Sequence, residues 1–195
     1  FIGNRSSGKM GYAIARDAAR RGAEVLLVSG PTALPAPRNV KFQSVETTRE
    51  MMDAVLAAYP KVDVVIMAAA VADYRPHHAE EQKIKKNDDT LTLSLDKNPD
   101  ILKQLGQQKE HQFLVGFAAE TQHLLENAAA KVKKKNLDMI VANDVTMKGA
   151  GFSTDTNVVK LLFPSGEIRS LELMSKEAVG NHILDIVRDA VKRKV

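Results

Sequence analysis

The chain contains no cysteine among its 195 residues. It therefore forms no disulfide and no thiolate metal site, and it cannot use a cysteine nucleophile. This absence fits a reducing compartment, and we expect a cytoplasmic protein. Long hydrophobic runs are missing too. The longest, residues 62–72, is interrupted by Asp63 and is too short to cross a bilayer. We expect no membrane partner.

Aromatic residues make up only 5% of the chain, and none lies within the lysine clusters at residues 83–86 and 131–135. Proteins that bind single-stranded nucleic acid usually stack bases on aromatic side chains beside such basic groups. We therefore expect no nucleic-acid partner, although the net charge is +4. A polyanionic small molecule suits lysines that converge in the fold, and a solvated helix face is the simpler interpretation of Lys133 and Lys134.

The hydrophobic content of 44% and the length are enough for one substantial α/β domain and short for two. Because the sequence opens inside a predicted strand without an initiator methionine, we expect a domain excised from a longer protein. Strand and helix patterns alternate along it, which predicts a Rossmann-like, mostly parallel sheet with helices on both faces. The expected strands are residues 24–28, 40–45, 62–68, 113–117 and 138–142, and the expected helices are residues 48–59, 98–105 and 121–135.

Three further segments have distinct patterns. Two apolar runs flank Pro164-Ser165-Gly166, which predicts a β-hairpin at about residues 157–173. Ser175 is expected to cap a closing helix at about residues 175–193, with an apolar stripe toward the core. A lysine-bearing flap is expected at about residues 74–90, within a single domain of residues 1–195.

The first turn, Gly3 to Gly11, separates a strand end from a helix start, where backbone N–H groups favour an anion. It nearly fits two known phosphate-binding patterns. Gly8-Lys9 fits a P-loop, but Met10 replaces the hydroxyl residue that would hold Mg²⁺. The dinucleotide-binding pattern lacks its first glycine, because Ser6 stands there. A tight turn that serves only packing is the alternative.

A dinucleotide-binding enzyme would also place an acidic residue at the end of the second strand, for the ribose hydroxyls. That place is Ser29-Gly30, and the nearest acid, Glu24, precedes the strand. This weakens an NAD(P)-dependent reductase, which stays an alternative together with a nucleotide-sensing or nucleic-acid-binding module.

The segment from Ala69 to Asp73 is almost without side chains, so a ligand can lie against its backbone. Asp73 is suited to Mg²⁺, a ribose or an amide, or to capping the next segment. Lys83 lies in a segment with weak secondary-structure signals, which indicates either a mobile loop that carries charge to a phosphate or an exposed edge strand protected by lysine. We find no Ser-His-Asp arrangement, and a site without its own nucleophile suggests the joining of two substrates after nucleotide activation.

Six motifs in series resemble bacterial phosphopantothenoylcysteine synthetase, usually the C-terminal half of a bifunctional coenzyme A biosynthesis protein. The motifs span nearly the whole chain: residues 4–11, 69–74, 83–86, 97–101, 115–121 and 136–144. The resemblance implies a ligase in which CTP, with Mg²⁺, activates 4'-phosphopantothenate as an acyl-cytidylate that the amine of cysteine then attacks. It also implies a homodimer and fusion to a flavin-dependent decarboxylase domain.

By motif position, Asn4 resembles the asparagine that holds the acyl-cytidylate, and Lys83 resembles the flap lysine needed for catalysis. The resemblance and the first turn together give the expected nucleotide-binding set, with Asp73 also expected to face Mg²⁺ that is held mainly by the triphosphate. The set is Ser6, Ser7, Gly8, Ala69, Ala70, Asp73, Asn98, Pro99, Asp100, Ile101, Phe117, Lys131 and Lys135.

Overall fold

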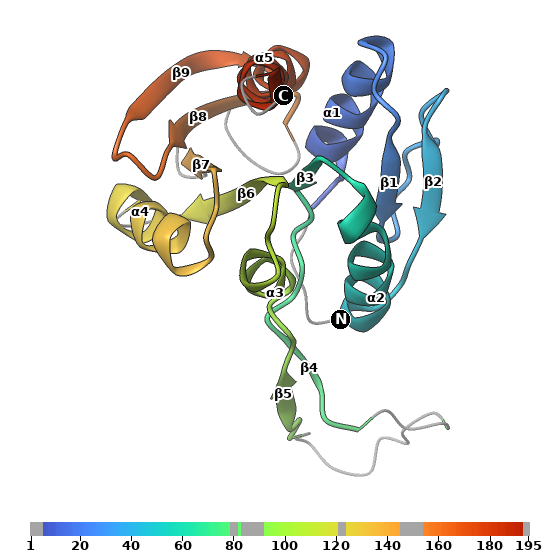
Figure 1. Cartoon of the computed structure of the whole chain (residues 1–195). Coiled ribbons are helices and arrows are strands. Elements are labelled where there is room, and N and C mark those ends of the chain that lie inside the picture. The colour runs from blue at the N-terminus through green and yellow to red at the C-terminus, as the bar shows by residue number, and fades with distance from the viewer. Residues whose placement is uncertain (1–5, 79–81, 83–91, 121–123, 145–153, 193–195) are drawn as a thin grey trace.

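Helices cover both faces of a central sheet in the computed structural model of the chain (Figure 1). The structure describes residues 6–78, 82, 92–120, 124–144 and 154–192. The five-stranded sheet has the order β3-β6-β7-β8-β9. Its strands are β3 (Val64–Met67), β6 (Phe113–Glu120), β7 (Met139–Asp144), β8 (Thr156–Leu162) and β9 (Ile168–Ser175). The α/β class with flanking helices is confirmed.

The direction of the strands changes across this sheet. β3, β6 and β7 pair in parallel, whereas β8 and β9 add two antiparallel pairings. The C-terminal strands are the hairpin that Pro164-Ser165-Gly166 predicted. The parallel part therefore brings the carboxyl ends of three strands to one edge, where ligands bind in folds of this kind.

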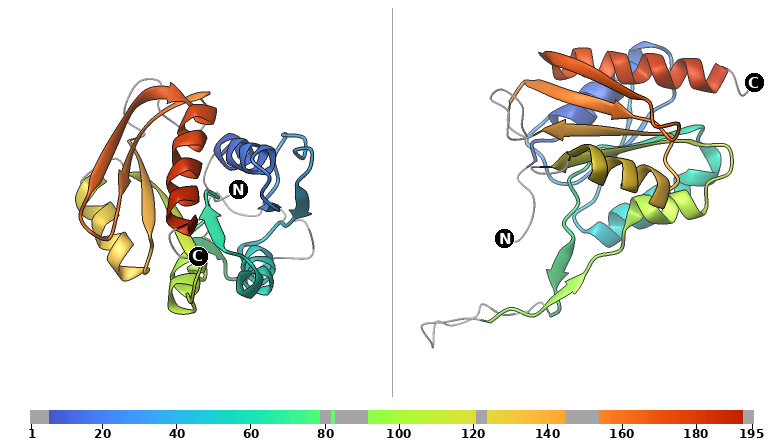
Figure 2. Two further views of the ribbon diagram at one scale, coloured as in Figure 1. Left: turned by 45° about the horizontal axis from the view of Figure 1, so that its top comes forward. Right: turned by 90° about the vertical axis from the view of Figure 1, so that its left-hand side faces the viewer.

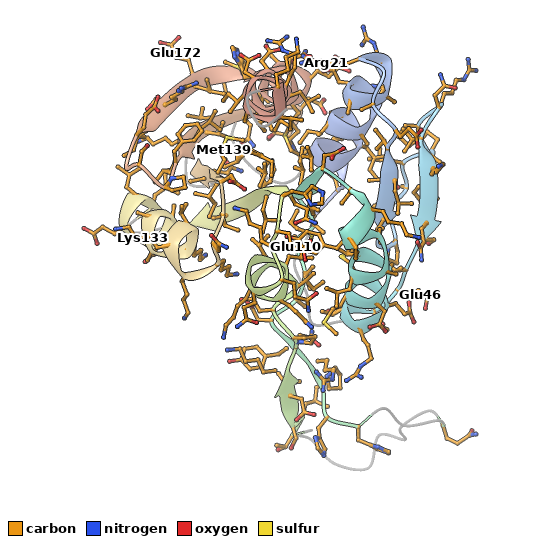
Figure 3. The ribbon with its side chains drawn as sticks, viewed as in Figure 1. Arg21, Glu46, Glu110, Lys133, Met139 and Glu172 are labelled. Carbon is orange, nitrogen blue, oxygen red and sulfur yellow. The ribbon has the colours of Figure 1, made fainter. Side chains whose placement is uncertain are left out.

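The two faces of the sheet carry separate cores, because neighbouring residues of a strand point to opposite sides. Val115, Val141 and Val159 pack with α1 (Lys9–Arg20) and α5 (Lys176–Lys192). Leu114 and Ile140 pack with the helices of the other face, which are α2 (Thr48–Ala58), α3 (Ile101–Gln107) and α4 (Leu124–Lys134). Figure 3 shows Met139 inside the molecule, while Lys133 and Glu172 point outward.

Helix starts follow from local hydrogen bonds that the sequence encodes. The Thr47 hydroxyl accepts from the Glu50 N–H at 3.1 Å and the Glu50 carboxylate accepts from the Thr47 N–H, so the two residues form a capping box before α2. Ser175 caps α5 by accepting from Ala178 N–H at 3.1 Å. After α2, a short 3-10 turn, η1 (Tyr59–Lys61), leads into β3.

The start of α3 corrects one expectation. We expected Pro99 in the first helical turn, but Asp100 is the N-cap and Pro99 precedes it. The Asp100 carboxylate accepts from the Lys103 N–H at 3.0 Å, so the acidic cap rather than the proline sets the first residue of this helix. Within the described residues, α4 begins at Leu124, and the remainder of its expected start falls on residues 121–123 outside them.

Two pairs of strands lie beside the central sheet. β1 (Leu26–Ser29) and β2 (Lys41–Ser44) are parallel and follow α1. β4 (Tyr74–Pro76) and β5 (Leu95–Lys97) are antiparallel and form an arm that projects from the body in Figure 1 and in the right view of Figure 2. The arm is the described base of the expected flap. Among the described residues, no helix is long and apolar enough to span a membrane.

Candidate functional site

The candidate site lies where the carboxyl ends of β1, β3 and β6 meet the start of α1. Gly11 places α1 against the end of β3, since a Cβ built on it would lie 3.7 Å from the Cβ of Ala68. The Tyr12 hydroxyl donates to Ser29 Oγ at 3.2 Å and so fixes α1 to the end of β1. The first turn and two strand ends are therefore held together by packing.

Gly8 gives the first turn its shape. It is the N-cap of α1 with a φ of 76°, in the left-handed region that glycine adopts without a steric penalty. A Cβ there would lie only 3.0 Å from Cγ2 of Thr32. The N-cap residue makes no side-chain cap, and the Lys9 N–H donates only a long hydrogen bond of 3.5 Å to Ser7 Oγ, so the start of this helix suits an anion. The predicted phosphate-binding turn therefore has the backbone geometry that it requires.

The side chain of Lys9 excludes a P-loop arrangement of this turn. Its ammonium donates to the Asp155 carboxylate at 2.6 Å, just before β8, instead of folding over the turn. Close by, the ammonium of the buried Lys176 donates to the carbonyl of Thr154. Burial lowers the pKa of Lys176 and the charge of Lys9 lowers it further, against an opposing effect of Asp155. The start of α1 is thus tied to the C-terminal hairpin and helix.

The small-residue loop after β3 is held by Asn98. Its amide donates to the carbonyl of Ala72 at 2.9 Å, and its backbone N–H donates to the carbonyl of Asp73 at 2.8 Å. Arg75 in turn donates to Asn98 Oδ1 at 3.2 Å and to the carbonyl of Lys97 at 2.9 Å. Two of the predicted segments are therefore in direct contact. The sequence did not point to Arg75, whose guanidinium orients the side chain of Asn98.

Asp100, the N-cap of α3, forms an ion pair with Lys135, which directly follows α4. The Lys135 ammonium lies 2.9 Å from one carboxylate oxygen of Asp100 and donates to the other at 3.0 Å. Partial burial raises the pKa of Asp100, but the hydrogen bonds from Lys103 N–H and Lys135 outweigh it and hold the pKa below its usual range. This pairing places a lysine beside the start of α3.

The other predicted site residues differ in their solvent exposure. Ala69 and Asp73 are exposed after β3, and Ala70 and Lys131 are half-buried. Ile101 is only 3% exposed within the core, so its side chain cannot meet a ligand. Phe117 is half-buried near the end of β6 and packs toward α1 and α5.

Asn4 and Lys83 lie outside the described residues, as do residues 84–86 and the strand expected before the first turn. Their roles stay predictions. Ser6 is exposed and Ser7 half-buried immediately before Gly8, as the phosphate-binding hypothesis requires.

A metal site made of protein ligands alone is absent from the described ranges, which contain no group of three acidic, histidine or cysteine side chains. Asp73 is exposed beside the small-residue loop. Mg²⁺ is commonly held by one or two carboxylates together with substrate phosphates, so the exposed carboxylate of Asp73 fits such an ion.

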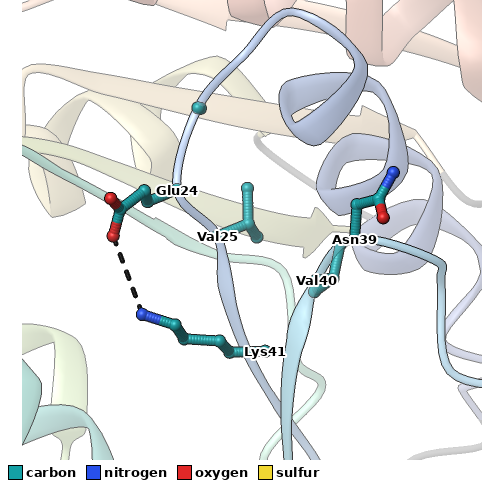
Figure 4. A pocket seen from close by; sticks show the side chains of 6 residues that line it. Glu24, Val25, Asn39, Val40 and Lys41 are labelled. Atoms are coloured by element: carbon teal, nitrogen blue, oxygen red, sulfur yellow. Dashed lines mark ion pairs between the residues drawn. The ribbon is translucent and has the colours of Figure 1, made fainter.

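A separate hollow lies away from this site. It has a volume of about 480 Å³ and is lined by residues 23–25 and 39–41, at the amino ends of β1 and β2 (Figure 4). The Glu24–Lys41 ion pair crosses its rim at 3.7 Å. Because ligands of parallel sheets bind beyond the carboxyl ends of the strands, we assign the site to the opposite edge.

The fold and the strand-end turn define an α/β domain with a candidate phosphate-binding site. The chain belongs to the DNA/pantothenate metabolism flavoprotein C-terminal domain family, whose pattern it matches over residues 1–191. Among its relatives is the coenzyme A biosynthesis bifunctional protein CoaBC of Bacillus subtilis, 49% identical over 94% of this chain and 46% of that protein. The Escherichia coli protein of the same name is 47% identical over 95% of this chain and 46% of its own length.

Solved structures agree with this assignment. The crystal structure of the C-terminal domain of a coenzyme A biosynthesis bifunctional protein CoaBC superposes with a TM-score of 0.83 at 43% identity, covering 97% of this chain and 86% of the other. A Streptococcus pneumoniae protein described as a DNA/pantothenate metabolism flavoprotein has a TM-score of 0.81 at 22% identity over 96% of this chain, which supports the fold alone. The chain spans about half the length of the curated relatives that it matches.

Proposed function

We propose that this chain is the phosphopantothenate–cysteine ligase domain of coenzyme A biosynthesis. The observation that carries the proposal is the match of nearly the whole chain to one half of bifunctional coenzyme A biosynthesis proteins. The strand-end site supports it, because the turn at Gly8, the loop at Ala69 and the Asp100–Lys135 pair suit a nucleotide.

In the first step, a carboxylate oxygen of 4'-phosphopantothenate attacks the α-phosphorus of CTP, and pyrophosphate leaves. The protein must hold the phosphates and offset the charge that grows on them. We propose that the N–H groups after Gly8 and the ammonium of Lys135 do this, with Lys131 one helical turn before Lys135. Asp73 would hold Mg²⁺, which when bound offsets phosphate charge. Asn4 and Lys83 are proposed to contact the intermediate.

In the second step, the amine of cysteine attacks the activated carbonyl carbon. The new C–N bond forms as the C–O bond to the cytidylate breaks, and CMP leaves with the electron pair. The ammonium of free cysteine loses two protons to water in all, one before attack and one from the resulting amide nitrogen. The role of the protein here is to exclude water from the acyl-cytidylate until the amine arrives.

The test is pyrophosphate release with CTP, ATP, GTP and UTP, each with and without 4'-phosphopantothenate. We expect release with CTP that depends on 4'-phosphopantothenate, and CMP with ligated product once cysteine is added. Pyrophosphate release with none of the four nucleotides would overturn the proposal. Binding of NADPH instead would favour a reductase, and salt-sensitive RNA binding would favour a nucleic-acid module.

The assembly of the protein is part of the same proposal. We infer a cytoplasmic homodimer in which this domain is fused to a flavin-dependent decarboxylase domain, since its relatives are named as bifunctional and are about twice as long. Size-exclusion chromatography with light scattering tests the dimer, and sequencing of the complete gene tests the fusion.

A further inference from the structure

Two buried asparagines have side-chain oxygens whose role is unexplained. Asn143 lies near the carboxyl end of β7, and Asn157 lies at the start of β8. Asn143 is 8% exposed and Asn157 is 4% exposed. The side-chain oxygen of each is buried and has no hydrogen-bond partner among the described residues. Buried polar atoms are nearly always paired, and leaving one unpaired costs stability. Two such atoms close together indicate a function that tolerates this cost.

The strand register places the two side chains next to each other. Asn143 on β7 pairs with Val159 on β8, and Asn157 lies two residues earlier on β8. Burial alternates along β8 and both Asn157 and Val159 are buried, so they share a face although the pairing of β8 with β9 is irregular between them. Residues diagonal to each other on a regular ladder lie about 7–8 Å apart. Val159 packs in the core beneath α1 and α5, so both amides point to the α1 side of the sheet.

This position borders the nucleotide-binding turn. Asn157 follows Asp155 by two residues, and Asp155 bonds the ammonium of Lys9 at the first residue of α1. The edge of the sheet is the one at which β3 and β6 end. A group held by the two amides would therefore stand beside a phosphate bound at Gly8.

We propose that Asn143 and Asn157 form the subsite for the amino group of the incoming amino-acid substrate. Two unpaired carbonyl-type acceptors select a group that donates hydrogen bonds, and among the three substrates the amino acid alone brings an aliphatic amine that has to be held beside the activated carbonyl. The acceptors would hold two of its N–H groups and leave the nitrogen lone pair directed at the activated carbonyl, which is how positioning lowers a barrier. This inference rests on the proposed ligase function.

A structural role predicts different behaviour from a binding role. If the two amides only support the fold, replacement by leucine, which is nearly isosteric, removes polar contacts and lowers the melting temperature. If they are unpaired acceptors kept for a ligand, Asn143→Leu and Asn157→Leu remove buried orphan atoms, and the melting temperature rises or stays unchanged. Gln112→Leu is the matched control, since that buried amide accepts from Glu110 N–H at 2.9 Å and donates to the carbonyl of Tyr59 at 3.2 Å.

The experiment compares the two half-reactions in each variant. Pyrophosphate release from CTP and 4'-phosphopantothenate without cysteine reports the first step, and the KM for cysteine reports the second. We expect each asparagine variant to raise the KM for cysteine by about tenfold, because it loses one net hydrogen bond to the amine. This increase should exceed any change in the rate of the first step. Gln112→Leu should lower the melting temperature and leave the cysteine KM unaltered.

The proposal fails if the cysteine KM stays within about twofold of wild type in both variants, or if both half-reactions fall in parallel. Asn143→Ser and Asn157→Ala give the same comparison if a leucine variant does not fold. The wild-type protein separates this failure from failure of the ligase proposal: without CTP-dependent pyrophosphate release in the wild type, the proposed function itself is wrong.

Discussion

Gly106 in α3 allows a close contact that any side chain would block. A Cβ built on it would lie 1.9 Å from the carbonyl oxygen and 2.7 Å from the carbonyl carbon of Lys135. These atoms are backbone, and they are fixed because the Asn136 amide donates back to the carbonyl of Gly106 at 3.0 Å. The end of α3 and the end of α4 therefore touch main chain to main chain.

Gly106→Ala should destabilise the protein. An ordinary Cβ contact of 3.4 Å or more requires the two helix ends to separate by more than an ångström. Because the obstructing atoms are backbone, the cost falls in the upper part of the usual range for overpacking, about 2–3 kcal/mol. Alanine recovers up to about 1 kcal/mol through its helix propensity, which leaves a net loss of about 1–2 kcal/mol. At about 2–4 °C per kcal/mol for a domain of this size, the melting temperature should fall by about 2–8 °C.

The matched control is Gly11→Ala, also inside a helix. Its Cβ would lie 3.7 Å from the Cβ of Ala68, an ordinary contact, so the propensity gain of up to about 1 kcal/mol should dominate and raise the melting temperature. Calorimetry on both variants decides the question. A Gly106→Ala protein as stable as wild type would refute the close-contact argument, because helix propensity alone predicts the same sign for both glycines.

Four further predictions concern the site. Gly8→Val should weaken CTP binding about tenfold and reduce stability by about 1–2 kcal/mol, because a residue with a Cβ is strained at this φ; unchanged CTP titrations would contradict a backbone phosphate site. Asn4→Asp should fold normally but lose ligation in a product assay, and normal rates would remove Asn4 from the site. Lys83→Gln should abolish most turnover at an unchanged melting temperature, whereas an edge-strand role predicts intact activity. Because the folded pKa of Asp100 lies below the unfolded value of about 3.9, the stabilisation it gives at neutral pH is lost as the pH falls below about 4, and acid melts of Asp100→Asn should lack this contribution.

Much of the architecture could be predicted because its signals are local. Alternating strand and helix patterns, the Thr47 capping box, the Ser175 cap and the turn at Pro164-Ser165-Gly166 all depend on residues a few positions apart. The observed start of a helix differs from the expected one where a side chain caps it. Asp100 caps α3 one residue after Pro99, which was expected to lie in its first turn. The six motifs likewise indicated the family before any contact was known.

The sequence by itself determined the alternation of strands and helices in the body of the domain and the turn at Gly8, since periodicity and a left-handed glycine act over one or two turns of chain. Only the tertiary structure decided what the charged and amide groups near that turn do. Lys9 bonds Asp155 across 146 positions, and Lys135 bonds Asp100 across 35. Asn143 and Asn157 come together through the register of β7 and β8. No local pattern encodes such pairings, because they depend on how the helices and strands pack once each has formed.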